Sequence, residues 1–347
     1  MIDNKEENAI RRVMRSKVLS GYRGSWGDWF YGGTEIKALE KEWAEYFGVK
    51  HAIACNSATS GLWCALGAIG IKPKQEVIVT PYSMTCSASL PLLFGARPVF
   101  ADIEPDYYCL DPKSVEKRIT YYTKAILVVD LFGMPYDAEA INALAKKYDL
   151  FVIEDAAQAI GAKHKDKYAG TLGDIGVYSL NVHKHIQCGE GGIVVTDNDD
   201  LAMKVRLLMN HAEAVNNDLN DGRYIDLVGM NLRMTEMQAA ISRVQLEKLP
   251  DIFDKYQEYA GWFNIPVREG CTSAYYKFVP KTKDGKVWLN LSYTQEEADK
   301  IFAFKQHYIT PIYKMPLFRN LGYHQNICPV CEEVEKNIMI GWVKEIL

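Results

Sequence analysis

Short runs of consecutive apolar residues alternate with helical patterns between about residue 50 and residue 200. The runs are rich in β-branched residues, which is typical of strands that are buried on both faces. They are EVIVT (76–80), ARPVFADI (96–103), KAILVVDLF (124–132), LFVIEDAA (150–157), IGVYSL (175–180) and GGIVVT (191–196). Continuous apolar strands separated by helices predict an α/β domain whose parallel or mixed sheet is covered by helices on both faces.

Apolar residues at spacings of three and four predict helices between these strands. Two such segments, SGLWCALGAIGI (60–71) and AEAINALAKKY (138–148), suit crossover connections. A longer amphipathic pattern covers residues 233–250 and is predicted to end at Pro250, because proline removes a helix hydrogen bond.

The pattern changes after Pro250 to short aromatic-rich segments. Residues 273–280, 286–291 and 307–313 are predicted as strands, around a helix near residues 294–304. We therefore expect a large α/β domain with an N-terminal helical segment at residues 1–250 and a smaller α+β domain at residues 251–347.

Composition and charge restrict the possible partners. The 347 residues include 40 Lys and Arg against 44 Asp and Glu, a net charge of −4 without a long basic block, which argues against nucleic acid. No stretch approaches the roughly 20 apolar residues that span a bilayer, and the N-terminal residues lack the apolar core of a signal peptide. We expect a cytoplasmic protein that does not enter membranes.

The eight cysteines lie mostly within apolar stretches, which is typical of buried thiols in a reducing compartment. Cys328 and Cys331 have the spacing of half a zinc site or of a redox pair. A structural zinc site needs a second pair of ligands, so we expect no metal.

A polar segment from Asn56 to Ser60 directly precedes a helix rich in small residues. The free N–H groups and the positive dipole end of a helix start bind phosphate readily, and the hydroxyls of Thr59 and Ser60 would add donors. The alternative is that Ser57 or Thr59 only caps the helix.

Two further segments carry reactive side chains. Glu154 and Asp155 end an apolar strand, where α/β sheets place their ligands, although a carboxylate there could also serve a loop. Lys184 lies between His183 and His185, five residues after Ser179 and before the glycine-rich GEGG at 189–192. A lysine in a desolvated pocket or beside a cation becomes nucleophilic toward carbonyls.

Three features follow one another in the chain: a phosphate-binding helix start, an aspartate after an apolar strand, and a lysine some thirty residues later. Phosphate, a protonated ring nitrogen and an aldehyde are the three groups by which an enzyme holds pyridoxal 5'-phosphate. The set therefore predicts an enzyme that uses this cofactor.

The chain also resembles a known family, the DegT/DnrJ sugar aminotransferases. The resemblance covers nearly the whole chain and rests on segments in family order and spacing: YFGVKHAIACNSATSGL, EVIVTPYSMT, GARPVFADIEPD, VIEDAAQAIGA, GDIGVYSLNVHKHIQCGEGGIVVTD and NLRMTEMQAAISRVQLEKL. It implies the fold of a type I pyridoxal phosphate-dependent transferase, with a mostly parallel sheet of the seven-stranded type sandwiched by helices and a smaller C-terminal α+β domain.

The resemblance also implies roles for single residues. Lys184 and Asp155 would be catalytic: the lysine bonds the cofactor aldehyde, and the aspartate pairs with the pyridine nitrogen. The other cofactor-binding residues it implies are Thr59, Ser60 and Ser179 at the phosphate, Gln158 near the ring, Met84 where family members stack an aromatic residue, and Asn231 at the phosphate of the neighbouring subunit. Tyr82 is the alternative to Met84. The contact of Asn231 with the neighbouring subunit implies a homodimer with shared sites.

The implied activity moves an amino group from glutamate or glutamine to a nucleotide-linked 4-keto-6-deoxy sugar, through pyridoxamine phosphate, in amino-sugar and polysaccharide biosynthesis. A 3-keto sugar or a keto-inositol is an alternative substrate. The sugar dehydratases of this family carry a histidine in place of the lysine, whereas Lys184 aligns without a gap.

The rival from another class is a non-catalytic regulator that keeps the fold. A dinucleotide or P-loop enzyme is excluded, because neither glycine-rich fingerprint occurs in the chain.

Overall fold

The computed structural model describes residues 2–219, 221–280, 282–283, 286–287, 294–306, 308–324 and 327–344. Contacts divide the chain into two compact units, each built from two separate segments. The first unit comprises residues 1–71 and 174–250, and the second comprises residues 72–173 and 251–347. The predicted domains at 1–250 and 251–347 share one boundary with this division, and the domain assignment itself stays a prediction.

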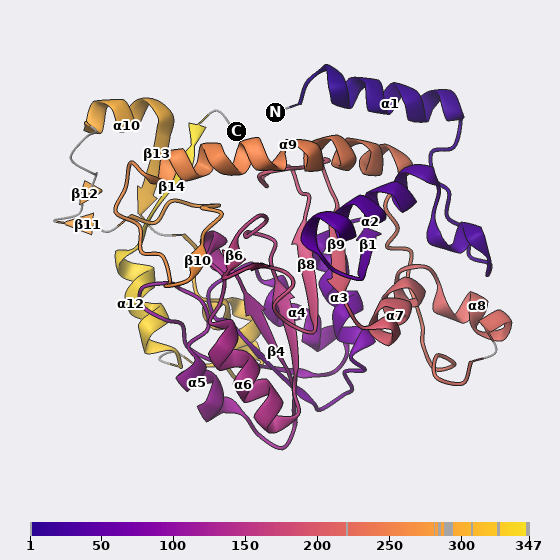
Figure 1. Ribbon diagram of the computed structural model, residues 1–347. Coiled ribbons are helices and arrows are strands. Elements are labelled where there is room, and N and C mark those ends of the chain that lie inside the picture. The colour runs from indigo at the N-terminus through magenta and orange to yellow at the C-terminus, as the bar shows by residue number, and fades with distance from the viewer. Residues whose placement is uncertain are drawn as a thin grey trace. The chain divides into compact units, whose positions relative to one another are not determined.

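The first unit contains helices around a short antiparallel arrangement of strands (Figure 1). Its elements are α1 (Asn4–Ser16), η1 (Asp28–Tyr31), α2 (Thr34–Phe47), β1 (His51–Cys55), α3 (Ala58–Ala68), β8 (Ile175–Ser179), β9 (Gly192–Thr196), α7 (Asp199–Met209), α8 (Ala212–Leu219) and the first part of α9 (Glu236–Ala260). β9 lies between β1 and β8 and is antiparallel to both. The carboxyl ends of β1 and β8 therefore lie at the same edge.

The N-terminal helix α1 packs on α9 within this unit, as Figure 1 shows. Ala9 and Val13 of α1 contact Ala240 of α9 in a small apolar cluster. Lys248 of α9 donates to the buried Glu6 at 2.6 Å. This ion pair and the cluster attach α1 to the unit.

The second unit contains four parallel strands in the order β5, β4, β2, β3. The elements before the chain leaves this unit are β2 (Glu76–Val79), α4 (Cys86–Leu93), β3 (Arg97–Phe100), α5 (Pro112–Arg118), β4 (Thr123–Val129), η2 (Leu131–Gly133), α6 (Ala138–Tyr148), β5 (Phe151–Asp155), β6 (Lys163–His164) and β7 (Lys167–Tyr168). After α9 come β10 (Cys271–Thr272), β11 (Thr282–Lys283), β12 (Lys286–Val287), α10 (Gln295–Ile301), β13 (Phe302–Gln306), η3 (Ile312–Lys314), α11 (Pro316–Asn320), α12 (Pro329–Asn337) and β14 (Met339–Val343).

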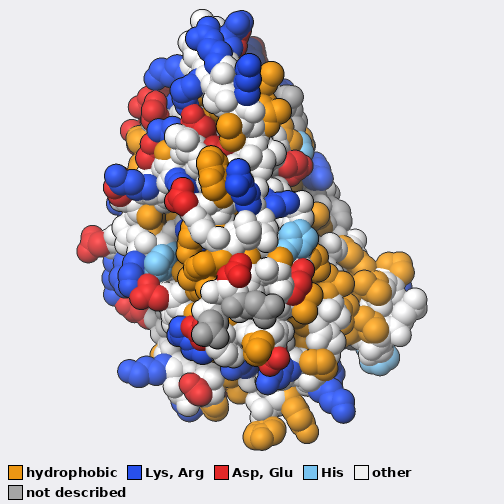
Figure 2. All heavy atoms as spheres, turned by 90° about the vertical axis from the view of Figure 1, so that its right-hand side faces the viewer, with side chains coloured by type: hydrophobic (Ala, Val, Ile, Leu, Met, Phe, Trp, Pro, Cys, Tyr) orange, Lys and Arg blue, Asp and Glu red, His pale blue; other side chains and the backbone are white. Residues whose placement is uncertain are grey.

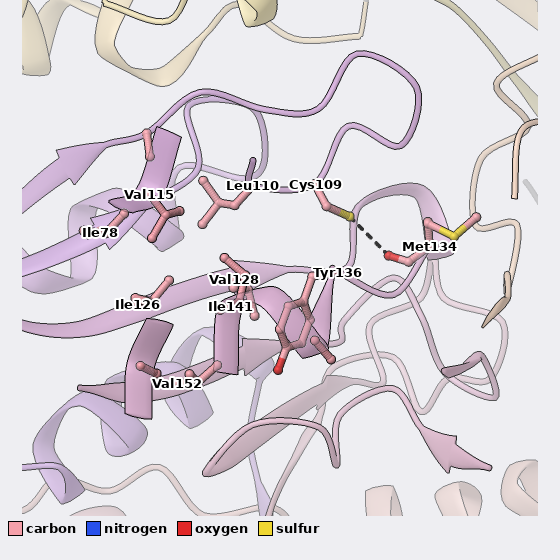
Figure 3. Close-up of a cluster of buried hydrophobic side chains, with 13 residues drawn as sticks. Ile78, Cys109, Leu110, Val115, Ile126, Val128, Met134, Tyr136, Ile141 and Val152 are labelled. Carbon is pink, nitrogen blue, oxygen red and sulfur yellow. Dashed lines mark hydrogen bonds between the residues drawn. The ribbon is translucent and has the colours of Figure 1, made fainter. Parts of the chain in front are cut away.

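One apolar cluster joins the parallel strands to the helices of this unit (Figure 3). Ile78, Ile126 and Val152 come from three neighbouring strands, and Ile141 of α6 packs against them. All are nearly inaccessible to solvent, and each such side chain contributes about 1.5–3 kcal/mol of burial free energy. The continuous apolar runs in the sequence are therefore explained by strands without a solvent face.

Each of the six predicted apolar runs coincides with a strand to within one residue at its start, namely β2, β3, β4, β5, β8 and β9. The predicted helix at 138–148 is α6, whose N-cap Asp137 accepts from the N–H of Ala140 at 3.0 Å. The helix predicted near 60–71 is α3, which begins two residues earlier. These predictions are confirmed.

Three predictions around the C-terminal third are wrong. Helix α9 continues through Pro250 to Ala260, because Tyr256 and Ala260 are buried in an aromatic cluster that offsets the missing hydrogen bond. Residues 273–280 make only an isolated bridge, between Phe278 and Gly341, and residues 308–311 are irregular before η3. Of the strand predicted at 286–291, only 286–287 are described and they belong to β12.

Surface charges of both signs are interspersed on the face that Figure 2 shows. Within the described part of the chain, no helix is both long and apolar enough to cross a membrane.

Candidate active site

The loop that joins β1 to α3 presents a row of donors. Ser57 is the N-cap of α3, and its Oγ accepts from the backbone N–H of Ser60 at 3.1 Å. The Ser60 hydroxyl donates to Oδ1 of Asn56 at 2.6 Å. The N–H groups of Ala58 and Thr59 lie in the first turn, where a helix offers them no acceptor, and Thr59 is exposed. Ser57 therefore caps the helix, while the first turn keeps donors for an anion.

The edge formed by β1, β9 and β8 brings this helix start close to Ser179. Gly192 of β9 pairs with Cys55 on one side and with Ser179 on the other. A Cβ atom on Gly192 would lie 2.5 Å from the carbonyl carbon of Ser57, so only glycine permits this approach. The close approach explains why the last residue of the GEGG segment is glycine. The phosphate candidates Thr59, Ser60 and Ser179 share one edge.

Lys184 lies on the connection between β8 and β9, in the same unit. Backbone bonds from Leu180 to Gly191 and from Val182 to Gly189, each 2.9 Å, close the connection at its base. Lys184 is half-buried and its N–H donates to Asn181 O at 2.9 Å. The two flanking histidines differ: His185 is buried and His183 is exposed.

Asn231 lies on an exposed segment beside the loop that precedes α3. The N–H of Asn56 donates to the carbonyl of Leu232 at 2.8 Å, and Arg233 forms a bridge with Cys55. The first unit therefore brings Asn231 near the helix start of its own chain. The predicted contact of Asn231 with a neighbouring subunit stays a prediction.

The second unit holds the other candidates, at the end of β5. Asp155 is buried, its Oδ1 accepts from Ala157 N–H at 3.1 Å, and its carbonyl accepts from Asp130 N–H at 3.1 Å. Gln158 is buried and its Oε1 accepts from Phe132 N–H at 2.9 Å. Phe132 has a positive φ of 59°, so this bond holds a strained residue against Gln158.

Glu154 precedes Asp155 but serves the protein interior. It accepts from the N–H groups of Gly170, Leu172 and Gly173 at 2.7, 2.8 and 3.1 Å. Burial raises the pKa of Glu154, and burial together with the charge of Glu154 raises the pKa of Asp130 well above its usual value. Glu154 is therefore held by the backbone of residues 170–173, and Asp155 is left as the ligand candidate of the strand end.

Met84 and Tyr82 differ in accessibility. The side chain of Met84 is 67% exposed, whereas Tyr82 is fully buried and meets the ring of Tyr308 edge-on at a centroid distance of 5.8 Å. A buried Tyr82 has no free face for a ligand, which favours Met84 of the two. The stacking of Met84 on a cofactor ring stays a prediction.

Tyr308 was missed by sequence reasoning. Its ring also packs edge-on against Phe132 at 5.0 Å, it hydrogen-bonds Gln158, and burial raises its pKa. It belongs to a segment that was predicted as a strand, and no periodicity or motif distinguishes it there.

Among the described residues, no group of three or more His, Cys, Asp or Glu side chains could hold a metal. Cys328 and Cys331 lie buried at the start of α12, where burial raises the pKa of both thiols. Buried thiols with raised pKa values are poor nucleophiles, which argues against a redox pair.

The sequence model of the DegT/DnrJ/EryC1/StrS aminotransferase family matches residues 23–341. A solved structure, the aminotransferase from Psychrobacter cryohalolentis, superposes with a TM-score of 0.82 at 30% identity and covers all of this chain and 93% of its own. Its likeness confirms the predicted α/β fold class of the type I transferases.

Three curated relatives carry names that describe different functions. A pleiotropic regulatory protein of Geobacillus stearothermophilus is 35% identical over 89% of this chain and 84% of its own length. A GDP-perosamine synthase of Caulobacter vibrioides is 42% identical over 67% of this chain and 61% of its own length. A UDP-N-acetyl-3-dehydro-alpha-D-glucosamine 3-aminotransferase of Acidithiobacillus ferrooxidans is 39% identical over 72% of this chain and 67% of its own. The match thus spans less than two thirds of the synthase.

Proposed function

Because the chain belongs to the DegT/DnrJ/EryC1/StrS aminotransferase family, we propose that it transfers an amino group from glutamate or glutamine to a keto sugar, specifically a nucleotide-linked 4-keto-6-deoxy sugar. Membership confirms the resemblance seen in the sequence, the aminotransferase class and the use of pyridoxal phosphate. The substrates are our proposal.

The main support for this function is the group of residues that meet at the edge where β1 and β8 end. The first turn of α3, Ser179 and the loop with Lys184 belong to one unit and are joined there through Gly192. Free N–H groups and hydroxyls at the positive end of a helix fit a phosphate group. Thr59, Ser60 and Ser179 would hold the phosphate, so the residues present fit the cofactor.

Lys184 and Asp155 would do the chemistry. The amine of Lys184 would hold the cofactor aldehyde and, once displaced by the donor amine, would move the proton taken from the donor Cα. The carboxylate of Asp155 would keep a proton on the pyridine nitrogen, because an opposite charge favours the protonated ring. The bound cofactor supplies an electron sink for the pair left on the donor carbon.

We also propose the environment in which this chemistry takes place. Asn231 would reach the phosphate of a neighbouring subunit in a homodimer with shared sites, and Gln158 and Met84 would contact the ring. The eight free cysteines support a reducing compartment, so we propose the cytoplasm as the location.

A 3-keto sugar is the second candidate substrate. The name of the Acidithiobacillus ferrooxidans relative gives a 3-dehydro sugar as its substrate, which supports this alternative. A keto-inositol is a third candidate. These substrates differ in the position of the ketone, so direct assay is needed to choose among them.

The test is an absorbance titration of the purified protein with pyridoxal phosphate. We expect a visible band that bleaches with glutamate or glutamine and returns with one keto sugar, because each half-reaction changes the conjugation of the cofactor. A panel should contain nucleotide-linked 4-keto and 3-keto sugars and a keto-inositol. A band that no amino donor changes would contradict the proposal.

Lys184→Ala is the matched variant in this titration. It removes the amine that bonds the aldehyde but leaves the helix start, so phosphate binding should persist while transamination is lost. Normal turnover in Lys184→Ala would disprove the assignment of the lysine.

A non-catalytic regulator is the alternative from another class, supported by the regulatory protein of Geobacillus stearothermophilus among the relatives. A regulator would bind no amino donor productively. The same titration decides between them, because only an enzyme restores the band with a keto sugar.

A further inference from the structure

The side chain of Arg233 contacts the candidate phosphate residue Asn231. Arg233 is half-buried, and its Nε donates to Oδ1 of Asn231 at 2.8 Å. Asn231 itself is exposed. The two side chains therefore form a pair in which one amide end faces the guanidinium and the other faces solvent.

The chemistry of arginine decides which end of the amide faces outward. A guanidinium carries five donors and no acceptor, so only the amide oxygen of Asn231 can face it. The Nδ2 group then points away from Arg233, and it donates to no group in the described part of the chain. The Asn231 side chain thus directs a hydrogen-bond donor outward, and an anion needs such donors.

The guanidinium is itself fixed by a second asparagine. Nη1 of Arg233 donates to Oδ1 of Asn210 at 3.2 Å. Asn210 is fully buried, and its Nδ2 donates to the carbonyls of Arg23 and Phe30 at 3.0 and 3.3 Å. Both ends of the Asn210 amide are occupied, so the arginine is held by a group that cannot flip.

Backbone pairing places the same segment at the edge described above. Asn231 bridges to Asn210 and Arg233 bridges to Cys55, the last residue of β1. Residues 231–233 are therefore paired with two other parts of the backbone, and they lie next to the loop that leads into the first turn of α3. Backbone pairing on two sides therefore fixes the part of the chain that carries the outward amide.

We propose that Arg233 is a positioning residue that locks the Asn231 amide as a hydrogen-bond donor to the cofactor phosphate. This inference rests on the proposed function, in which Asn231 reaches the phosphate of a neighbouring subunit. Arg233 acts through Asn231 and does not itself touch the cofactor.

The test compares equilibrium binding of pyridoxal phosphate with binding of pyridoxal, which lacks the phosphate. Arg233→Met removes the donors but keeps the aliphatic bulk. We expect Arg233→Met and Asn231→Ala each to weaken pyridoxal phosphate binding about tenfold, the size of one charge-assisted hydrogen bond, and to leave pyridoxal binding unchanged. The double variant should bind no more weakly than Asn231→Ala, since both changes remove the same contact.

Two further variants keep the test decisive. Asn231→Asp leaves an oxygen to face Arg233 but replaces the donor by a second oxygen, so it should also weaken phosphate binding while the protein folds. Arg223→Ala removes one exposed arginine that pairs with Asp221, and it should leave both affinities unchanged. Circular dichroism and sedimentation check that the variants keep their fold and assembly.

The outcomes separate the inference from its premise. If Asn231→Ala and Asn231→Asp both bind pyridoxal phosphate normally, the proposed role of Asn231 fails and the inference falls with it. If those variants weaken binding but Arg233→Met does not, or if the double variant is additive, the inference alone is overturned. A loss of pyridoxal binding in Arg233→Met would indicate a general structural role and would also overturn it.

Discussion

Adjacent carboxylates at the end of β5 have different surroundings, although the sequence presents them as one pair. Side chains alternate between the two faces of a strand, so Glu154 and Asp155 cannot both face a ligand. Glu154 accepts three backbone amides from residues 170–173, while Asp155 stays at the strand end. The sequence predicts a carboxylate at this edge, but only the loop that folds onto Glu154 distinguishes the two.

The buried acid beside Glu154 makes stability depend on pH. Burial and the charge of Glu154 raise the pKa of Asp130 in the folded protein, whereas Asp130 ionises near pH 4 when unfolded. Its contribution to stability is therefore fully present below about pH 4 and is lost as pH rises toward the folded pKa. The free energy of unfolding of the wild type should therefore fall with rising pH, by at most about 1.4 kcal/mol per pH unit from this group. We expect a shallower fall for Asp130→Asn, because asparagine cannot ionise.

Urea unfolding of both proteins across the range from pH 5 to pH 8 measures this difference. Asp166→Asn is the matched control, since Asp166 is an exposed aspartate in the β6–β7 turn, and it should follow the wild type. Identical pH profiles for Asp130→Asn and the wild type would show that Asp130 is ionised in the folded protein.

Sequence reasoning finds site residues only where a motif or a strand end identifies them. Thr59, Ser60, Asp155 and Lys184 stand at such places, next to the apolar runs that predict strands. Arg233 and Tyr308 depend on contacts with residues far away in the chain, so no local pattern indicates them. Their contacts follow from the fold, which local patterns in one sequence do not reveal.

At the scale of single elements, local capping signals explain some helices and not others. α6 has its own N-cap, Asp137, and was predicted with the observed bounds. α2 begins after Gly33, which has no side chain to cap it. The buried Glu236 caps it instead, accepting from the N–H groups of Gly33 and Glu35 at 3.0 and 2.7 Å. A cap supplied from about 200 residues away leaves no local signal.

Helix α9 is the element whose extent was wrongly predicted, and its proline offers a test. Pro250 is exposed and leaves the carbonyl of Leu246 without its helical donor. Pro250→Ala restores the donor and removes no packing. In the helix, alanine is more favourable than proline by up to about 3 kcal/mol. The unfolded chain is more flexible with alanine, which reduces this gain by about 1 kcal/mol. We therefore expect the free energy of unfolding to increase by about 2 kcal/mol.

Chemical unfolding monitored by circular dichroism gives this value directly. Glu247→Ala, a nearby exposed position of the same helix, should change stability by less than about 0.5 kcal/mol. If Pro250→Ala is neutral or destabilising, the helix at this point already satisfies the Leu246 carbonyl in another way.

At the scale of the whole molecule, the chain enters each unit twice. The first unit takes residues 1–71 and 174–250, and the second takes 72–173 and 251–347. Composition and periodicity describe neighbours in sequence, so they predict contiguous domains and the strands inside them. Which segments associate depends on pairing such as that of β1 with β9, which joins residues 51–55 to 192–196. The fold class could be predicted, but this arrangement could not.

The proposed shared site leads to a prediction for the assembled protein. Lys184 would act in one subunit and Asn231 in the site of its neighbour. In a mixed dimer of Lys184→Ala and Asn231→Ala chains, one site then carries both substitutions and the other carries none. Random exchange of equal amounts should leave about one site in four intact, because half of the dimers are mixed and each has one intact site.

Activity at limiting pyridoxal phosphate, measured after subunit exchange, reads out these intact sites. Each variant alone should be inactive or weak under this condition, and the mixture should regain activity as mixed dimers form. If each site were instead built from a single chain, every site in the mixed dimer would carry one of the two substitutions. Mixing would then restore nothing, and both the cross-subunit role of Asn231 and its positioning by Arg233 toward a neighbour would be disproved.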